Sequence, residues 1–186
     1  MTDEELFNSF LAGDHTMFEA LLKRYQKPLA GYLFRYTRNA TLAEEAFQET
    51  FIKIFEKRHL FQAGKPFKPW LYQIAVNTAT DKLRSRKLEP VTLEDKDEPR
   101  APLTYPSENL EREELAQRIA EAVVQLPHTQ RQVFVLREYQ ELSYAEISSI
   151  VQRPLNTVKS DMHRALQALR TLLDSLAEMV MEGEDV

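Results

Sequence analysis

Apolar residues recur at steps of three and four in three stretches of the first 90 residues. Pro28 interrupts the first stretch, which favours a kink, and Thr41 with Glu44 forms a capping box that opens the second. The third stretch runs from about Pro66 to Lys87. This periodicity predicts helices with one buried face. The expected inward residues are Met17, Phe18, Leu21, Leu22, Tyr25, Leu29, Tyr32 and Leu33 in the first helix, and Ala43, Phe47, Phe51, Ile54 and Phe55 in the second.

The second half continues the helical periodicity in shorter segments. Apolar positions over 110–126 predict a helix that Pro127 ends, and Thr129 is placed to cap the next one. That next helix carries Val133, Phe134, Leu136 and Arg137.

A pair of helices with a tight break between them follows. Ser143 and Glu146 form a second capping box, which opens a short helix, and residues 151–154 break it. Asn156 or Thr157 is then expected to cap a long helix, whose inward residues are Val158, Met162, Ala165, Leu166, Leu169 and Leu173. Two helices joined by about four residues, the second basic near its start, are typical of a helix-turn-helix.

The middle of the chain separates these halves. Residues 88–106 contain four of the nine prolines and a cluster of four carboxylates, with no apolar period to bury. Only four glycines occur, all scattered, and no Val/Ile/Thr alternation suggests strands. We therefore expect an all-α protein with two small helical domains joined by an acidic, proline-containing linker, divided as 1–88, linker 89–106, 107–175 and an acidic tail 176–186.

Composition excludes several classes of function. Cysteine is absent, the four histidines show no metal-ligand spacing, and catalytic constellations are weak, so an enzyme or a metal protein is the least supported class. No run approaches the roughly 18 apolar residues of a membrane helix, and the acidic start does not resemble a secretory signal. We expect a cytoplasmic protein that requires no cofactor. The net charge of −5 argues against indiscriminate DNA binding, although residues 1–90 carry +3.

Two local stripes could contact nucleic acid. The long C-terminal helix presents Lys159, Ser160, His163 and Arg164 opposite its apolar side, and Lys or Arg can bond guanine in a major groove. The end of the helix over 66–87 is basic through Lys82, Arg84, Arg86 and Lys87. The plain alternatives are a solvated helix face and cations that complement a helix dipole. For the nearby Trp70, a core position is the favoured interpretation.

Taken together, these segments resemble the extracytoplasmic-function group of bacterial sigma factors. Residues 43–55 (AEEAFQETFIKIF) resemble the core-polymerase-binding helix, and residues 67–77 (FKPWLYQIAVN) with Asp81 and Arg84 resemble the segment that melts and reads the minus-ten promoter element. Four motifs resemble the family's second domain: Leu126-Pro127, Gln130-Arg131, Leu136-Arg-Glu138 and Leu142-Ser-Tyr-Ala-Glu-Ile147. The segment Pro154-Leu-Asn-Thr-Val-Lys-Ser160 with His163-Arg-Ala165 resembles that domain's minus-thirty-five recognition helix.

The resemblance implies roles that composition cannot supply. It implies core RNA polymerase, promoter DNA and an anti-sigma factor as partners. It assigns polymerase docking to Glu44, Glu45, Gln48 and Glu49. It assigns contact with the minus-ten element to Phe61, Lys65, Asn77, Lys82, Arg84 and Arg86. It assigns contact with the minus-thirty-five element to Asn156, Thr157, Lys159, Ser160, His163 and Arg164. Phe61 and Asn77 match positions that hold a flipped base, where an aromatic ring replaces stacking and an amide bonds the base edge.

Two residues depart from the family pattern. Asn156 stands where glycine is usual, and asparagine also caps well. Asp161 stands where a basic residue is usual; a carboxylate repels phosphate but could accept from a cytosine amine. Two rival classes remain, a stand-alone helix-turn-helix regulator that uses only residues 126–173 and a helical adaptor that never touches DNA.

Overall fold

The computed structural model describes residues 1–62, 64–88 and 110–183, with side chains described over 1–62, 64–86 and 116–174. Every regular element in this part of the chain is a helix, which confirms the all-α prediction. The elements are α1 (Asp3–Leu11), α2 (His15–Thr37), α3 (Ala40–Glu56), the 3₁₀ turn η1 (Arg58–Leu60), α4 (Phe67–Leu88), α5 (Leu110–Gln125), α6 (His128–Phe134), the π-helical turn η2 (Val135–Tyr139), α7 (Tyr144–Val151) and α8 (Leu155–Gly183). The expected linker 89–106 and the end of the expected tail lie outside the described residues.

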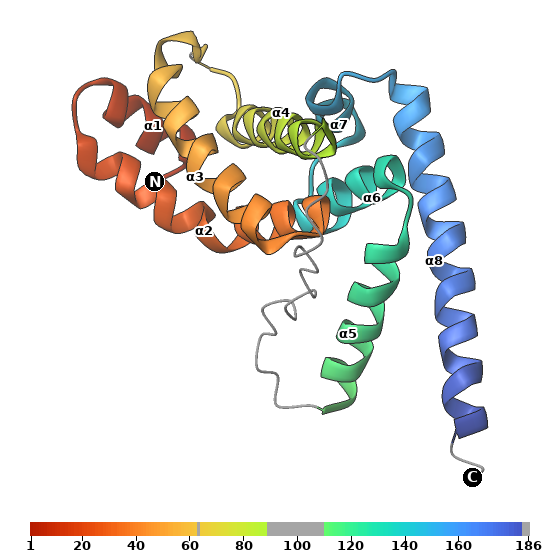
Figure 1. Cartoon of the computed structure of the whole chain (residues 1–186). Helices are drawn as coiled ribbons and strands as arrows, with labels where there is room; N and C mark the ends of the chain where they lie inside the picture. Colours follow the sequence, from red (N-terminus) through yellow and green to blue (C-terminus); the bar gives the residue numbers. More distant parts are fainter. Residues whose placement is uncertain (63, 89–109, 184–186) are drawn as a thin grey trace.

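Helices α1–α4 form the front half, in which α2, α3 and α4 pack on one another and α1 covers one end (Figure 1). Helix α1 was not predicted, although its start is a complete capping box between Thr2 and Glu5. Its apolar face buries Leu6, Phe7 and Phe10, so it closes the front core. The Phe67 amide donates to the Glu4 carboxylate at 2.8 Å, which joins the start of α4 to α1.

Two of the predicted helix caps in this structure are wrong. Asn39, rather than Thr41, caps α3, and its Oδ1 accepts from the Leu42 amide at 2.7 Å. No side chain caps α6, so Thr129 does not act as expected. Pro28 lies inside a continuous α2 and does not divide it. By contrast, the second predicted capping box, Ser143 with Glu146, is confirmed at the start of α7.

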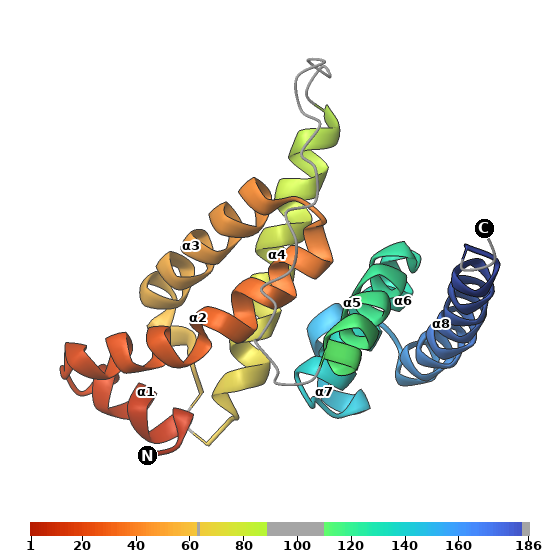
Figure 2. The ribbon, with the colours of Figure 1, turned by 90° about the horizontal axis from the view of Figure 1, so that it is seen from below.

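In the back half, α8 runs beside α5 and packs on α6 and α7, and Figure 2 shows this half beside α2 and α4. Two residues expected to point inward do not: Leu166 is 50% exposed and Phe55 in the front half is 41% exposed. Phe55 lies at the edge of an aromatic cluster, with its ring 5.7 Å from that of Phe10. Helix ends and edges leave room for such partly covered side chains.

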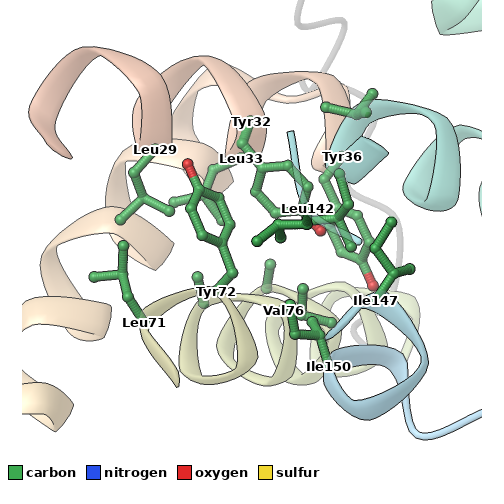
Figure 3. Close-up of a cluster of buried hydrophobic side chains, with 14 of the residues drawn as sticks. Leu29, Tyr32, Leu33, Tyr36, Leu71, Tyr72, Val76, Leu142, Ile147 and Ile150 are labelled. Atoms are coloured by element: carbon green, nitrogen blue, oxygen red, sulfur yellow. The ribbon is translucent and has the colours of Figure 1, made fainter. Parts of the chain in front are cut away.

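The two halves share one continuous core. Helices α2 and α4 of the front half contact α6, η2 and α7 of the back half. In Figure 3, Tyr36 and Val76 lie against Leu142, Ile147 and Ile150, and each of these side chains is buried. The sequence predicts two tethered domains, and it does not predict that they pack together.

Candidate nucleic-acid interface

The helix-turn-helix is formed by α7, the turn 152–154 and α8. Gln152 adopts the left-handed conformation (φ 52°) that ends α7, and its amide donates to the Ser148 carbonyl. The Ser148 hydroxyl donates to the Arg153 carbonyl at 2.6 Å, which ties the turn back to α7. The Thr157 and Val158 amides then donate to the Pro154 carbonyl at 2.9 and 3.1 Å, so α8 starts at Leu155.

This start places Asn156 and Thr157 within the first turn of α8 rather than at its cap, which corrects the prediction. All six residues assigned to the minus-thirty-five element are exposed: Asn156, Thr157, Lys159, Ser160, His163 and Arg164. The residues between them, Val158, Asp161 and Met162, are buried, and so is Ala165, which follows Arg164. Helix α8 therefore presents an exposed polar and basic face at its N-terminal end, which is the geometry with which a recognition helix meets base edges.

Asp161 does not belong to that face. Its side chain is 5% exposed and forms an ion pair with the Arg153 guanidinium in the turn. The Arg164 guanidinium lies 3.9 Å away on the other side. In this structure the Asp161 carboxylate therefore neither repels phosphate nor accepts from cytosine. It lies in the interior and links the turn to α8 through its ion pair with Arg153. Arg153 is the functional residue that sequence reasoning missed here.

The residues assigned to polymerase docking lie on one face of α3. Glu44, Glu45 and Gln48 are exposed, and the Gln48 amide donates to the Glu44 carboxylate at 3.5 Å. The Glu49 carboxylate lies 2.7 Å from the Lys53 ammonium, and this hydrogen bond, followed by the one from Lys82, lowers the pKa of Glu49. This face is a row of side-chain oxygens suited to a cationic or amide-rich partner.

Lys82, assigned to the minus-ten element, is bound to the same carboxylates. Its ammonium lies 3.1 Å from Glu45 and 3.0 Å from Glu49. Partial burial lowers the pKa of Lys82, but the hydrogen bonds that its ammonium donates to Glu49 and Glu45 outweigh burial, and the pKa is raised. The structure thus brings one predicted DNA contact into the predicted polymerase site.

The remaining minus-ten residues divide between the surface and the core. Lys65, Asn77 and Arg84 are exposed, whereas Arg86 is partly buried and has interaction partners. Phe61 is only 9% exposed, and its ring packs against Phe7 at 4.9 Å. In this conformation neighbouring side chains cover most of the Phe61 ring, and its assigned contact with a flipped base stays a prediction. Trp70 packs partly buried against the same cluster, with its ring 5.2 Å from that of Phe61, as the core interpretation predicts.

Asn77 and Arg84 line a cleft of about 630 Å³ between the two halves. Front-half residues Lys53, Lys57, Thr80 and Asp81 also line it, and the back half contributes His128, Thr129, Gln132, Gln152 and Arg153. Among the residues whose side chains are described, no group of three or more His, Asp or Glu side chains could hold a metal ion. The described helices include none with the length and apolarity that crossing a membrane requires.

Fold and site define a helical DNA-binding protein with a helix-turn-helix in its back half. Comparison with known families is more specific. The family model for Sigma-70 region 2 matches residues 21–89, and that for Sigma-70 region 4 matches residues 116–169. The RNA polymerase sigma-H factor of Pseudomonas aeruginosa is 32% identical over 183 residues, covering 94% of this chain and 95% of that protein. The ECF RNA polymerase sigma-E factor of Escherichia coli K12 is 32% identical over 179 residues, covering 91% of this chain and 93% of that protein.

Solved structures support the same fold. CnrH, in complex with the cytosolic domain of CnrY, aligns with a TM-score of 0.68 at 24% identity, over 93% of this chain and 97% of that chain. The sigma factor RpoE of Bartonella quintana, in complex with the anti-sigma factor NepR, aligns with a TM-score of 0.66 at 24% identity, over 84% of this chain and 96% of that chain. The protein belongs to the extracytoplasmic-function group of the sigma-70 family. It is accordingly an alternative sigma factor that acts in transcription initiation.

Proposed function

We propose that this chain binds core RNA polymerase through the carboxylate face of α3, reads the minus-thirty-five element with the first two turns of α8, and opens the minus-ten element at α4. The observation that carries the proposal is the clean division of α8, whose six assigned residues are exposed while the positions between them are buried. A stand-alone regulator would need only the back half. Family matches in both halves and the ordered face of α3 favour the polymerase subunit.

The chain's own residues supply recognition rather than bond-making chemistry. In α8, Lys159 and Arg164 can donate to guanine, while Ser160 suits phosphate. At the minus-ten element, we assign base contact to Asn77 and backbone contact to Lys65 and Arg84. Extruding a base costs a few kcal/mol. The assembled holoenzyme would offset that cost, since a protein of net charge −5 binds DNA weakly by itself.

Phe61 is omitted from the set of base contacts. Its ring would have to leave Phe7, Phe67 and Trp70 before a base could stack on it. In our proposal, Phe61 supports the loop that carries Lys65. The base that Asn77 holds would then stack on other groups of the holoenzyme–promoter complex.

The partners follow from the same assignment. We propose that the chain acts in the cytoplasm with core polymerase and promoter DNA, and that an anti-sigma factor holds it inactive. Support for the last partner comes from the two similar structures. CnrH was solved in complex with the cytosolic domain of CnrY, and the sigma factor RpoE in complex with the anti-sigma factor NepR. The domain bounds we propose are residues 1–88 and 107–175.

In vitro transcription with purified core polymerase tests the proposal. The promoter is first found by sequencing the transcripts that appear when the protein is overproduced. Adding the full chain to core enzyme should then yield a transcript from that promoter, and core enzyme alone should yield none. Equal transcription with and without the chain would refute the proposed function.

A matched pair of substitutions tests the assignment of α8. Arg164→Ala and Arg170→Ala each remove an exposed arginine from the same helix, but only Arg164 belongs to the recognition face. Arg164→Ala should weaken initiation by about 1–3 kcal/mol, roughly 5- to 150-fold, if the guanidinium makes a bidentate base contact. Arg170→Ala should change it little. Equal effects of the two substitutions would show that α8 contributes only general charge.

A further inference from the structure

Helix α1 precedes the residues that either family model matches, and the family resemblance gives none of its residues a role. Its first turn carries the consecutive carboxylates Asp3 and Glu4. Asp3 is bound to α2, because its carboxylate accepts from the Arg24 guanidinium and from the Tyr25 hydroxyl. Glu4 is bound to α4, because it accepts from the Phe67 amide at 2.8 Å. The start of α1 is therefore fixed to two helices of the front half.

The bond from the Phe67 amide to Glu4 is a helix cap that another helix supplies. Helix α4 begins at Phe67, and the prolines at 66 and 69 carry no backbone N–H. The first three residues of α4 therefore offer only two N–H groups to a cap. Pro66, immediately before the helix, has no side-chain oxygen that could accept from them. A carboxylate also suits the positive end of a helix dipole, so Glu4 supplies from α1 what a Ser or Asp just before the helix usually supplies.

An aromatic cluster joins α1 to the loop between η1 and α4, here called the η1–α4 loop. Phe7 of α1 is fully buried. Its ring lies 4.9 Å from that of Phe61, where the loop begins, and 4.8 Å from that of Phe67, where the loop ends. Trp70 of α4 closes the cluster, with its ring 5.5 Å from that of Phe7. Figure 2 shows α1 beside the segment that joins α3 to α4, so α1 holds the loop at both ends.

Between these two anchors the described residues of the loop are exposed. The Lys65 amide donates to the Gln62 carbonyl at 3.1 Å, and Gly64 has a left-handed backbone (φ 83°) that glycine adopts without strain. The side chains of Gln62 and Lys65 lie in solvent. A loop with few buried contacts in its middle takes its position mainly from its ends. The place of Lys65, two residues before Phe67, therefore depends on α1.

We propose that α1 is a positioning element for the minus-ten strand, in which Glu4 and Phe7 hold the η1–α4 loop against the start of α4. The proposal rests on the proposed function, which assigns Lys65 of the loop and Asn77 of α4 to that strand. Phe67, which donates to Glu4, lies between these two residues along the chain, so its bond fixes the loop residue relative to the helix residue. A strand that must meet both contacts benefits when the loop is ordered before it arrives.

Substitution of Glu4 separates positioning from folding. Glu4→Ala removes the acceptor, whereas Glu4→Gln keeps a side-chain carbonyl that can accept from the Phe67 amide. Glu19→Ala, which removes an exposed carboxylate from α2, is the matched control. The rate of initiation is measured with saturating holoenzyme on the duplex promoter, and on the same promoter with its minus-ten element opened beforehand by mismatches. Far-ultraviolet circular dichroism shows that each variant is folded, and co-elution shows that it binds core polymerase.

On the duplex promoter, Glu4→Ala should lower the rate of initiation at least about fivefold, because a charge-assisted hydrogen bond that orders the loop is lost. Glu4→Gln and Glu19→Ala should stay within about twofold of the natural chain, since the first keeps an acceptor and the second leaves the loop untouched. On the opened promoter, the rate for Glu4→Ala should return to within about twofold of the natural chain, because the strand no longer has to be captured as it unpairs. Co-elution with core polymerase should be the same for all variants.

The only tryptophan of the chain reports the anchor in the free protein. Trp70 belongs to the aromatic cluster, so its fluorescence responds when the loop and α1 separate. Glu4→Ala should raise the quenching of Trp70 by acrylamide at least about 1.5-fold, since loosening one end of the loop opens the cluster more often. Glu19→Ala should leave the quenching unchanged.

Four results would overturn the proposal: Glu4→Ala that initiates on the duplex promoter as well as the natural chain or better, an equal loss on duplex and opened promoters, a Glu4→Gln variant as impaired as Glu4→Ala, or unchanged quenching of Trp70. If Glu4→Ala fails to fold, Glu4→Ser, whose hydroxyl ends short of the carboxylate position, repeats the comparison. Failure of the natural chain itself to initiate with core polymerase would count against the proposed function, and it is distinct from a defect confined to Glu4→Ala.

Discussion

The ion pair between Arg153 and Asp161 allows the turn of the helix-turn-helix to be tested from both partners. The Asp161 side chain is 5% exposed and that of Arg153 is 25% exposed. Removing Arg153 leaves the buried Asp161 carboxylate without its main ion-pair partner. Among the described side chains, the only other cation within 4.0 Å of this carboxylate is Arg164, at 3.9 Å. Replacing Asp161 by asparagine removes the charge, while Arg153 can still turn toward water. The two substitutions should therefore not cost the same.

The magnitudes follow from burial. Removing one partner of a fully buried ion pair costs about 3–5 kcal/mol. Since Arg153 is one-quarter exposed and Arg164 compensates in part, we expect Arg153→Ala to cost about 3 kcal/mol. Asp161→Asn keeps an oxygen that can accept from Arg153, so it should cost about 1 kcal/mol. The double variant has no stranded charge and should be more stable than Arg153→Ala alone.

Urea and thermal unfolding followed by circular dichroism measure these differences. At about 2–4 °C per kcal/mol for a chain of this size, Arg153→Ala should lower Tm by roughly 6–12 °C. Adding Asp161→Asn to Arg153→Ala should restore part of that loss. If the double variant is no more stable than Arg153→Ala, the carboxylate is not stranded and the ion pair does not hold the turn. Arg170→Ala, which removes an exposed arginine, is the control.

Three further predictions concern the front half and its charges. Lys82→Ala should raise the pKa of Glu49 toward its ordinary value, measured by NMR titration, and Lys57→Ala, which removes an unrelated exposed lysine, should not. Because the folded pKa of Glu49 is lowered, its contribution to stability is present above the unfolded pKa and is lost as the pH falls through the folded pKa. Lys82→Ala should therefore make the free energy of unfolding decline less steeply between these two pKa values. Burial raises the pKa of Tyr25, Tyr32 and Tyr72 far above the ordinary value. Their contribution to stability is therefore fully present below pH about 10 and falls by about 1.4 kcal/mol each per pH unit above it, and ultraviolet absorbance should show these three tyrosines ionising only as the protein unfolds.

Periodicity predicted most of the helices because each half buries one face of every helix. The third predicted helix, from about Pro66 to Lys87, agrees within a residue with α4. Helix α1 is missing from the prediction, although Asp3, Glu4 and Glu5 lie in its first turn. Of these, Glu5 completes a capping box with Thr2, so a signal for a helix is present in the sequence.

The interface between the halves could not be predicted from helical patterns. A residue such as Val76 shows only that its side of α4 is apolar, whether it packs on α2 or on α7. Gln140 is polar and ordinary in the sequence, and its role depends on a π turn that places it beside Tyr72. Phe61 shows the converse. The family resemblance assigns its ring to a flipped base, but three aromatic neighbours from α1 and α4 cover it.

Asp161 illustrates how a helix face is best assigned from sequence. Its charge suggested a place on the DNA-facing side with Lys159 and Ser160. At 100° per residue, however, position 161 lies three residues after Val158 and four before Ala165, on the buried stripe that both share. Spacing therefore indicates a buried position for Asp161, which the sequence analysis did not predict. A buried aspartate on such a stripe requires a cation, and only the tertiary structure shows that the cation is Arg153, delivered by the turn of the helix-turn-helix. The departure from the family pattern thus concerns how α8 is held against the turn, and we still propose that the six assigned, exposed residues of α8 read DNA.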